Sequence, residues 1–191
     1  MAERRSALAH LPASAPGRDA LTLRELRPGS IVQIAAWPDT LASVQAVVAE
    51  ALGVAVPRTG TSAAAGGMEL LAIAPGRFFV RAETAGLAEH FESALAPSNG
   101  AVTDLSHGRA ILRLEGKAAA SVLAKGVAVD LELGAFPPGR VAQTAIHHID
   151  VTIFRRAEDV FDLWVLRGFA EALAEWLLDA GVELGIGFGN G

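Results

Sequence analysis

The segment GFAEALAEWLL (Gly168–Leu178) decides the fold, because the chain carries an earlier version of it. The earlier version, GLAEHFESALA (Gly86–Ala96), begins 82 residues before it, and Gly, Ala and Glu coincide at three of the first four positions. At the same offset, Phe79 falls on Phe161. Upstream of each segment, the apolar periodicity predicts the same order of strand, helix, strand, strand and helix. A repeat of this size indicates a duplicated ferredoxin-like plait.

The first copy is expected to contain short strands and two helices, each bounded by Pro, Gly or a capping residue. They are the strand Ile31–Trp37, the helix Leu41–Leu52, the strands Glu69–Ala74 and Arg77–Glu83, and the helix Gly86–Leu95. Asp39 or Thr40 can cap the first helix by accepting a backbone N–H, and Gly53 ends it. Pro75-Gly76 predicts a tight hairpin turn, and 57–67 is expected to be a loop.

The second copy follows the same order. Its elements are the strand Ala110–Glu115, the helix Lys117–Lys125 ended by Gly126, the strands Gln143–His147, Val151–Arg155 and Phe161–Leu166, and the helix Gly168–Ala180. Before both copies, LTLREL (Leu21–Leu26) alternates apolar and polar residues and predicts a short edge strand.

Hairpin turns within both copies imply antiparallel pairing, so the sequence predicts an α+β fold, with antiparallel sheets and packed helices in two ferredoxin-like halves. The expected parts are an N-terminal arm (1–29), a first half (30–100), a second half (101–184) and a flexible C-terminal tail (185–191). The tail is rich in glycine, but it lacks the preceding strand and following helix of a dinucleotide-binding fingerprint.

Composition narrows the classes of function. The 191 residues are 51% hydrophobic and carry a formal charge of −5, so nucleic acid is not an expected partner. The chain has no cysteine, which excludes disulfides, thiolate metal sites and cysteine nucleophiles. No apolar run approaches the roughly 20 residues of a membrane span, and the start does not resemble a signal peptide. A cytoplasmic location, with no membrane partner, is therefore expected.

The stretch Thr103–Arg109 holds the densest group of reactive side chains, namely Asp104, Ser106, His107 and Arg109. A Ser–His–Asp relay is not expected here, because triad members usually come from distant segments. Asp104 and Ser106 are expected to hold a turn by hydrogen bonding backbone N–H groups, with His107 and Arg109 available to a partner. Ligand contact and direct catalysis stay open as weaker alternatives.

Two other groups of residues carry side chains that could bind a metal or act as acids. His147 and His148 are adjacent on a predicted strand, so their side chains should point to opposite faces and should not share a metal. Glu171, Glu175 and Asp179 recur every fourth residue along the last predicted helix and are expected to form a solvated acidic face. The residues therefore predict no catalytic, cofactor-binding or metal site in this chain.

Four blocks resemble the sarcosine oxidase gamma subunit family, and their order and spacing agree with it. The blocks are AVTDLSHGRAILRLEG (Ala101–Gly116), VLAKGVAVDL (Val122–Leu131), FPPGRVAQT (Phe136–Thr144) and FDLWVLRGFAEALAEWLLDAG (Phe161–Gly181). More distantly, the pattern is similar to the amino-terminal part of the glycine-cleavage T-protein, a folate-binding domain.

This resemblance implies a noncatalytic structural subunit in a complex with alpha, beta and delta subunits. Such a complex oxidatively demethylates sarcosine to glycine, with hydrogen peroxide and either formaldehyde or methylene-tetrahydrofolate as products. Its FAD, FMN, NAD, zinc and tetrahydrofolate are implied to lie in the other subunits. Two alternatives remain: a stand-alone folate-binding aminomethyl-transfer protein, and a subunit of an oxidase for another N-methyl amine.

Overall fold

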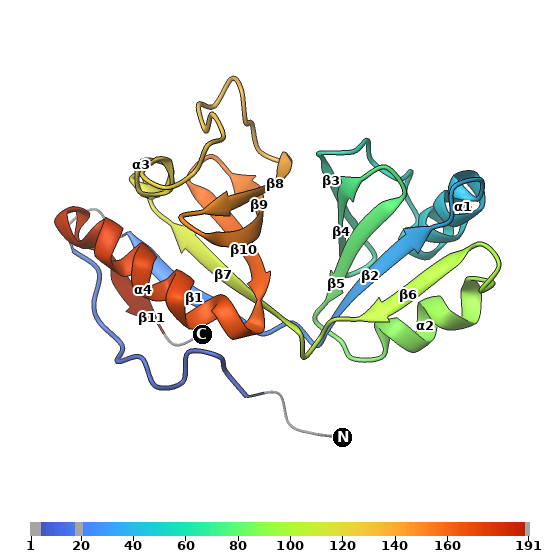
Figure 1. The fold of residues 1–191 in the computed structure, drawn as a ribbon, viewed down its shortest axis with the longest axis horizontal. Coiled ribbons are helices and arrows are strands. Elements are labelled where there is room, and N and C mark those ends of the chain that lie inside the picture. The colour runs from blue at the N-terminus through green and yellow to red at the C-terminus, as the bar shows by residue number, and fades with distance from the viewer. Residues whose placement is uncertain (1–4, 18–20, 190–191) are drawn as a thin grey trace. The chain divides into compact units, whose positions relative to one another are not determined.

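Two units, separated after Arg27 and after Ser106, make up the computed structural model of the chain. The continuous unit is Pro28–Ser106. The discontinuous unit combines Met1–Arg27 with His107–Gly191, so it takes its residues from both ends of the chain (Figure 1). The first division lies two residues before the boundary expected at 29/30. The second lies six residues after the boundary expected at 100/101, because the strand at 100–104 pairs with the strand at 30–36 of the continuous unit.

The structure describes residues 5–17 and 21–189. Parts of the expected N-terminal arm (1–4 and 18–20) and of the expected tail (190–191) lie outside the described residues. Within the described ranges, no helix combines the length and the apolar character that crossing a membrane requires.

The continuous unit is a five-stranded antiparallel sheet with two helices. In chain order its elements are β2 (Ser30–Ala36), α1 (Leu41–Leu52), β3 (Ser62–Ala65), β4 (Met68–Ala74), β5 (Arg77–Ala82), α2 (Leu87–Ala94) and β6 (Gly100–Asp104). The strands lie in the order β3-β4-β5-β2-β6, and every neighbouring pair is antiparallel. Leaving aside the edge strand β3, this is the βαββαβ plait that the sequence predicted.

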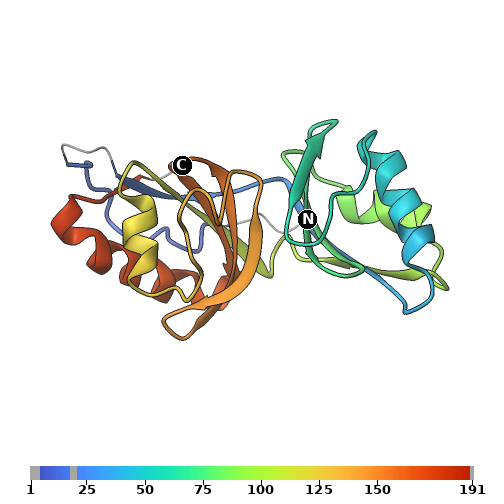
Figure 2. The same cartoon turned by 90° about the horizontal axis from the view of Figure 1, so that it is seen from above.

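The core of the continuous unit lies between its sheet and the two helices, which cover the same face (Figure 2). Val44 and Val48 of α1 and Phe91 of α2 are buried against strand residues such as Val32 and Val80. Burying each such side chain contributes about 1.5–3 kcal/mol relative to leaving it exposed. The helices are therefore held in place mainly by this apolar contact.

The discontinuous unit is a six-stranded sheet that is also covered by helices. Its elements are β1 (Thr22–Leu26), β7 (Arg109–Glu115), α3 (Ala119–Ala124), β8 (Val141–Ile146), β9 (Ile149–Ala157), β10 (Val160–Leu166), α4 (Ala170–Gly181) and β11 (Gly187–Gly189). The strand order is β11-β1-β7-β10-β9-β8. The strands β9-β10-β7-β1 repeat the arrangement β4-β5-β2-β6 of the continuous unit.

Strand β1 occupies the fourth-strand position of this plait, although it comes from the N-terminal end of the chain. It pairs antiparallel with β7, with Leu23 opposite Leu114, and both leucines are fully buried. On its other side it pairs parallel with β11, with Leu23 opposite Phe188. The prediction of an edge strand at 21–26 is therefore wrong, because β11 covers the outer edge of β1.

The C-terminal segment Gly187–Gly189 is a strand, so the prediction of a flexible tail is wrong for these residues. Ser14 of the N-terminal arm donates its N–H to the Phe188 carbonyl at 2.9 Å, and Ser14 Oγ accepts the Phe188 N–H at 2.9 Å. A Cβ placed on Gly187 would lie only 2.4 Å from the backbone nitrogen of Pro16. Glycine at this position therefore permits close approach of the arm.

In the strands β5 and β10, the structural correspondence of the two copies differs by one residue from the 82-residue offset found in the sequence. Phe161 lies on the helix-covered face of its sheet, whereas Phe79 lies outside the core cluster that its neighbours Phe78 and Val80 join. Because side chains alternate along a strand, the structural counterpart of Phe161 is Phe78. The pairing of Phe79 with Phe161 is therefore wrong by one position, although the helices that follow keep the 82-residue offset.

Two of the predicted helix ends are confirmed and one is wrong. Gly53 ends α1 in the left-handed conformation, with φ of 74°, as predicted. Thr40 makes no side-chain cap to α1, and its hydroxyl donates to the Trp37 carbonyl at 3.1 Å. Helix α3 ends before Gly126, as predicted, but Gly126 is not in the left-handed conformation. A Cβ there would come 2.5 Å from the Trp176 ring, so Gly126 is required for space.

Candidate functional site

Asp104 and Ser106 form a turn at the end of β6. Asp104 Oδ1 accepts the Ser106 N–H at 2.8 Å. The buried Ser106 Oγ accepts the Ile31 N–H at 3.0 Å and donates to the Ile31 carbonyl at 3.3 Å. Ser106 thus joins the end of β6 to the beginning of β2, which confirms the predicted turn and gives both side chains a structural task.

His107 and Arg109 follow directly in the chain but belong to the discontinuous unit, since the division falls after Ser106. The four residues of the motif therefore do not form one site within either unit. His107 is exposed, and Arg109 begins β7 half-buried. Burial lowers the pKa of the Arg109 guanidinium from its ordinary value. A guanidinium stays charged at neutral pH in proteins, so Arg109 remains a cation.

Arg109 lines a pocket of about 420 Å³ in the discontinuous unit. The other lining residues come from the middle of β8, the beginning of β9 and the end of β10: Gln143, Thr144, Asp150, Val151, Thr152 and Leu166. The volume lies within the range of about 300–1,000 Å³ typical of small-molecule sites. The lining offers one guanidinium and no Phe or Trp, so a flat ring such as a flavin or a pterin has no aromatic side chain on which to stack.

A second pocket, of about 410 Å³, belongs to the continuous unit. It lies where the β5–α2 connection meets the β3–β4 hairpin, and its lining includes Met68, Glu83, Gly86, Leu87 and His90. None of the four residues expected at a site lines it. Its side chains are mainly apolar, with one carboxylate and one imidazole.

The sequence reading missed a buried charge cluster on the sheet of the discontinuous unit. Asp162 is fully buried and accepts two hydrogen bonds from Arg113, at 2.6 and 2.8 Å, and one from Arg156 at 3.0 Å. Removing three charges from water costs free energy that this pairing offsets. The signal was available: Asp162 interrupts the otherwise apolar strand VFDLWVL.

The reading also missed Arg155, whose buried side chain has no carboxylate partner among the described residues. Its Nη1 donates to the Leu131 and Phe136 carbonyls at 2.9 and 2.8 Å, and its Nε and Nη2 donate to the Glu158 carbonyl. The guanidinium also lies over the Phe161 ring, 4.9 Å from its centroid. Arg155 thus links the β9–β10 hairpin to the α3–β8 loop.

The two adjacent histidines lie in a turn, so the prediction that they occupy a strand with opposed side chains is wrong. His147 has a positive φ of 55° in the two-residue turn between β8 and β9. Its ring centroid lies 4.0 Å from that of His148. Among residues 5–17 and 21–189, no group of three or more His, Asp or Glu side chains is placed to hold a metal ion.

The acidic residues of α4 are exposed, as expected. Glu171 contacts the His10 imidazole at 2.7 Å, and both side chains are about half exposed. Glu175 and Asp179 also face solvent on this helix.

The class of fold is that of the glycine-cleavage aminomethyltransferases. The aminomethyltransferase T of the glycine cleavage system from Bartonella henselae matches 92% of this chain with a TM-score of 0.65. At 21% identity this likeness concerns the fold alone, and the chain spans about half of that protein, 48%.

The chain belongs to the sarcosine oxidase gamma subunit family, whose model matches residues 36–183. The sarcosine oxidase subunit gamma of Corynebacterium sp. strain U-96 is 34% identical over 185 residues, covering 93% of this chain and 89% of that protein. The same-named subunit of Arthrobacter sp. is 35% identical over 186 residues, covering 94% and 91%.

A solved structure agrees with this assignment. One chain of the heterotetrameric sarcosine oxidase from Corynebacterium sp. U-96, in complex with pyrrole 2-carboxylate, matches with a TM-score of 0.85 at 34% identity. The match covers 95% of this chain and 96% of that one. The family resemblance carried by the four sequence blocks is therefore confirmed.

Proposed function

We propose that this chain is the gamma subunit of a heterotetrameric sarcosine oxidase and serves the complex as a noncatalytic structural subunit. The observation that carries the proposal is the match, over nearly the full length of both chains, to a chain of such an oxidase. The partners are then the alpha, beta and delta subunits, and the complex works in the cytoplasm.

The reaction of the complex converts sarcosine, O2 and water to glycine, formaldehyde and hydrogen peroxide. With tetrahydrofolate present, the one-carbon unit leaves as methylene-tetrahydrofolate. FAD, FMN, NAD, zinc and tetrahydrofolate are bound by the other subunits.

A subunit without catalytic residues still contributes to such a reaction. The one-carbon intermediate is reactive, so the sites that make and consume it benefit from a fixed distance and from exclusion of water. A subunit whose surfaces hold the catalytic subunits in fixed positions provides both the fixed distance and the exclusion of water. In this proposal His107 and Arg109, after the turn held by Asp104 and Ser106, contact a partner subunit.

Co-expression with the three other subunits tests the proposal. We expect all four chains to co-purify in equal amounts, with sarcosine-dependent peroxide production that falls when this chain is omitted. Failure of the chain to enter the complex would contradict the proposal. Saturable binding of tetrahydrofolate to the isolated chain would favour an aminomethyl-transfer protein instead, and a preference of the complex for dimethylglycine over sarcosine would change the substrate.

A further inference from the structure

Two loops at equivalent places in the two units begin with the same four residues but differ in length. Gly53–Gly60 and Gly126–Gly139 both open with Gly-Val-Ala-Val, and they contain eight and fourteen residues. Both end on the same contact: the Gly60 N–H donates to the Ala72 carbonyl, and the Gly139 N–H donates to the Arg155 carbonyl, each at 2.7 Å. Eight residues are therefore enough to connect helix and strand in this plait, and the second loop carries extra chain.

The extra chain has a defined conformation. The Asp130 carboxylate accepts the Glu132 N–H at 2.9 Å. The Glu132 carbonyl accepts N–H groups from Ala135 at 3.0 Å and from Phe136 at 2.8 Å. Leu131 and Phe136 are buried, at 6% and 3% exposure, and fix the two ends of the segment in the core.

Arg155 holds both ends of this segment at once. One nitrogen, Nη1, donates to the carbonyls of Leu131 and Phe136. Ala72 is the counterpart of Arg155 in the continuous unit, where the loop is short and needs no such support. A buried guanidinium is costly to desolvate, and among the described residues Arg155 has no carboxylate partner to offset this. Its hydrogen bonds serve the loop and the neighbouring hairpin instead.

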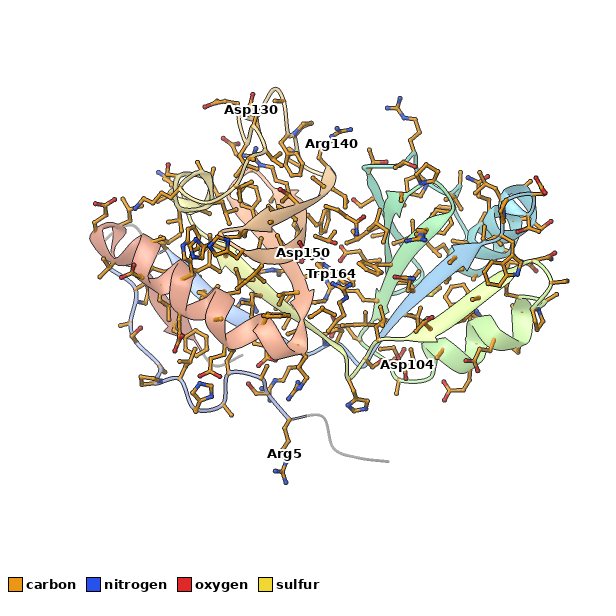
Figure 3. The ribbon with its side chains drawn as sticks, viewed as in Figure 1. Arg5, Asp104, Asp130, Arg140, Asp150 and Trp164 are labelled. Carbon is orange, nitrogen blue, oxygen red and sulfur yellow. The ribbon has the colours of Figure 1, made fainter. Side chains whose placement is uncertain are left out.

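The surface of the ordered segment combines one apolar side chain with negative charge. Leu133 is 42% exposed at the turn. Asp130 and Glu132 precede it in the chain, and they are the only charged residues between Val129 and Arg140. Figure 3 shows Asp130 on the far part of the α3–β8 loop, beyond the end of the sheet. An exposed leucine on a fixed acidic loop complements an apolar pocket with a basic rim.

We propose that Asp130–Phe136 is a preformed docking loop for a partner subunit of the oxidase. Leu133 enters an apolar pocket of that subunit, and Asp130 and Glu132 pair with Lys or Arg side chains at its rim. A loop that is ordered before binding loses little conformational entropy on association, which strengthens the complex. The inference rests on the proposed function, since it identifies the surface through which the subunit role is carried out.

The first test compares two exposed aliphatic positions of the discontinuous unit in the co-expressed complex. Leu133→Asp should lower the amount of partner subunits that co-purify with the chain by tenfold or more. The matched control Val182→Asp, at a residue that is 71% exposed, should leave it unchanged. If wild type assembles and Leu133→Asp assembles equally well, the docking loop is refuted while the subunit role stands. If wild type itself fails to assemble, the proposed function fails.

The second test separates charge and order from the apolar contact. Asp130→Asn with Glu132→Gln keeps the turn but removes both charges, and it should slow association several-fold at low salt and not at high salt. Arg155→Lys cannot reach both carbonyls, so the amides of Ala135 and Phe136 should exchange with deuterium at least tenfold faster. Unchanged exchange would show that Arg155 does not order the loop, and equal association rates at low salt would exclude a basic rim.

Discussion

The two units build the same plait from different connections of the chain. In the continuous unit, the strand beside β2 is β6, which follows it in the chain, with Thr103 opposite Gln33. In the discontinuous unit, the strand beside β7 is β1, which precedes it by more than 80 residues, with Arg24 opposite Arg113. Both pairs are antiparallel. Strand β1 buries Leu23, whereas β6 adds the partly buried Val102 to its core. A strand that precedes or one that follows in the chain can therefore fill this position.

The units differ again on the sheet face opposite their helices. In the continuous unit, Arg81 Nε lies 2.6 Å from the buried Glu69 Oε2, and Arg81 Nη1 lies 3.3 Å from the exposed Glu83 Oε1. The discontinuous unit holds the cluster in which Arg113 and Arg156 share the buried Asp162. On this face of each sheet, the buried carboxylates Glu69 and Asp162 are met by arginine side chains.

The largest expected effect comes from removing β1 from the discontinuous unit and then restoring it. The fragment 107–191 lacks the strand that contributes Leu21 and Leu23 to the core, and each buried leucine is worth about 2–5 kcal/mol. We expect this fragment to show no cooperative unfolding in urea, whereas 28–106 unfolds cooperatively. A permuted chain that places 1–27 after 191 through a flexible linker should restore the transition. Cooperative unfolding of 107–191 alone would show that the fourth position can stay empty.

The charge clusters give the next largest effect. Asp162→Asn leaves two guanidinium groups beside a neutral amide and should lower the free energy of unfolding by about 3–5 kcal/mol. Glu69→Gln removes the charge that faces Arg81 and should lower the free energy of unfolding by about 1–3 kcal/mol. Urea titrations of both variants provide the measurement. Equal losses would mean that the second arginine of the Asp162 cluster adds nothing.

Substitutions at Gly53 and Gly126, which open the two Gly-Val-Ala-Val loops, should respond differently to the second-site change Trp176→Leu. Gly126→Ala drives a methyl group into the Trp176 ring and should cost about 1–3 kcal/mol. Gly53→Ala meets no atom within 4 Å but strains a left-handed backbone, at about 1–2 kcal/mol. Trp176→Leu should reduce the destabilisation caused by Gly126→Ala and leave that caused by Gly53→Ala unchanged. Thermal unfolding of the single and double variants measures both effects. Equal rescue of both would contradict the distinction between space and backbone conformation.

The smallest effect concerns the C-terminal end of α4. This helix has twelve residues, whereas its counterpart α2 has eight. Lys125 Nζ lies 2.7 Å from Glu183 Oε1, and its hydrogen bond and charge lower the pKa of that carboxyl. A carboxyl whose pKa is lower in the folded state stabilises the fold at neutral pH, and this contribution is lost as the pH falls through the folded pKa. Glu183→Gln should therefore lower Tm slightly near pH 7 and not well below about pH 4. A difference that persists in acid would point to packing instead.

Sequence reading recovered the elements that bury a regular apolar face. The helices α1, α2 and α4 and the strands β2, β5, β7 and β10 all lie within a few residues of their predicted bounds. The edge strand β3 escaped because Ser62–Ala65 has no apolar alternation, and β11 escaped because Gly187 and Gly189 resemble a flexible end. Both strands owe their conformation to a neighbouring strand, which a local pattern does not reveal.

The candidate site was predictable only at short range. The bond between Asp104 and Ser106 joins residues two positions apart and was predicted correctly, whereas the contact of Ser106 with Ile31, 75 residues away, was not. Arg155 and Asp162 acquire their roles from segments up to 49 residues away, so no local pattern marked their partners. The assignment of β1 to the second plait needed the same long-range information.

The placement of β1 also determines the order in which the two sheets can form while the chain is being synthesised. Its partner β7 begins at Arg109, more than 80 residues after Leu26, and at a translation rate of about 5–20 residues per second the strand waits roughly 4–17 seconds. The continuous unit can complete its sheet on the ribosome during this interval. The newly made strand exposes Leu21 and Leu23 meanwhile, and the charges of Arg24 and Glu25 beside them discourage pairing with a strand of another nascent chain.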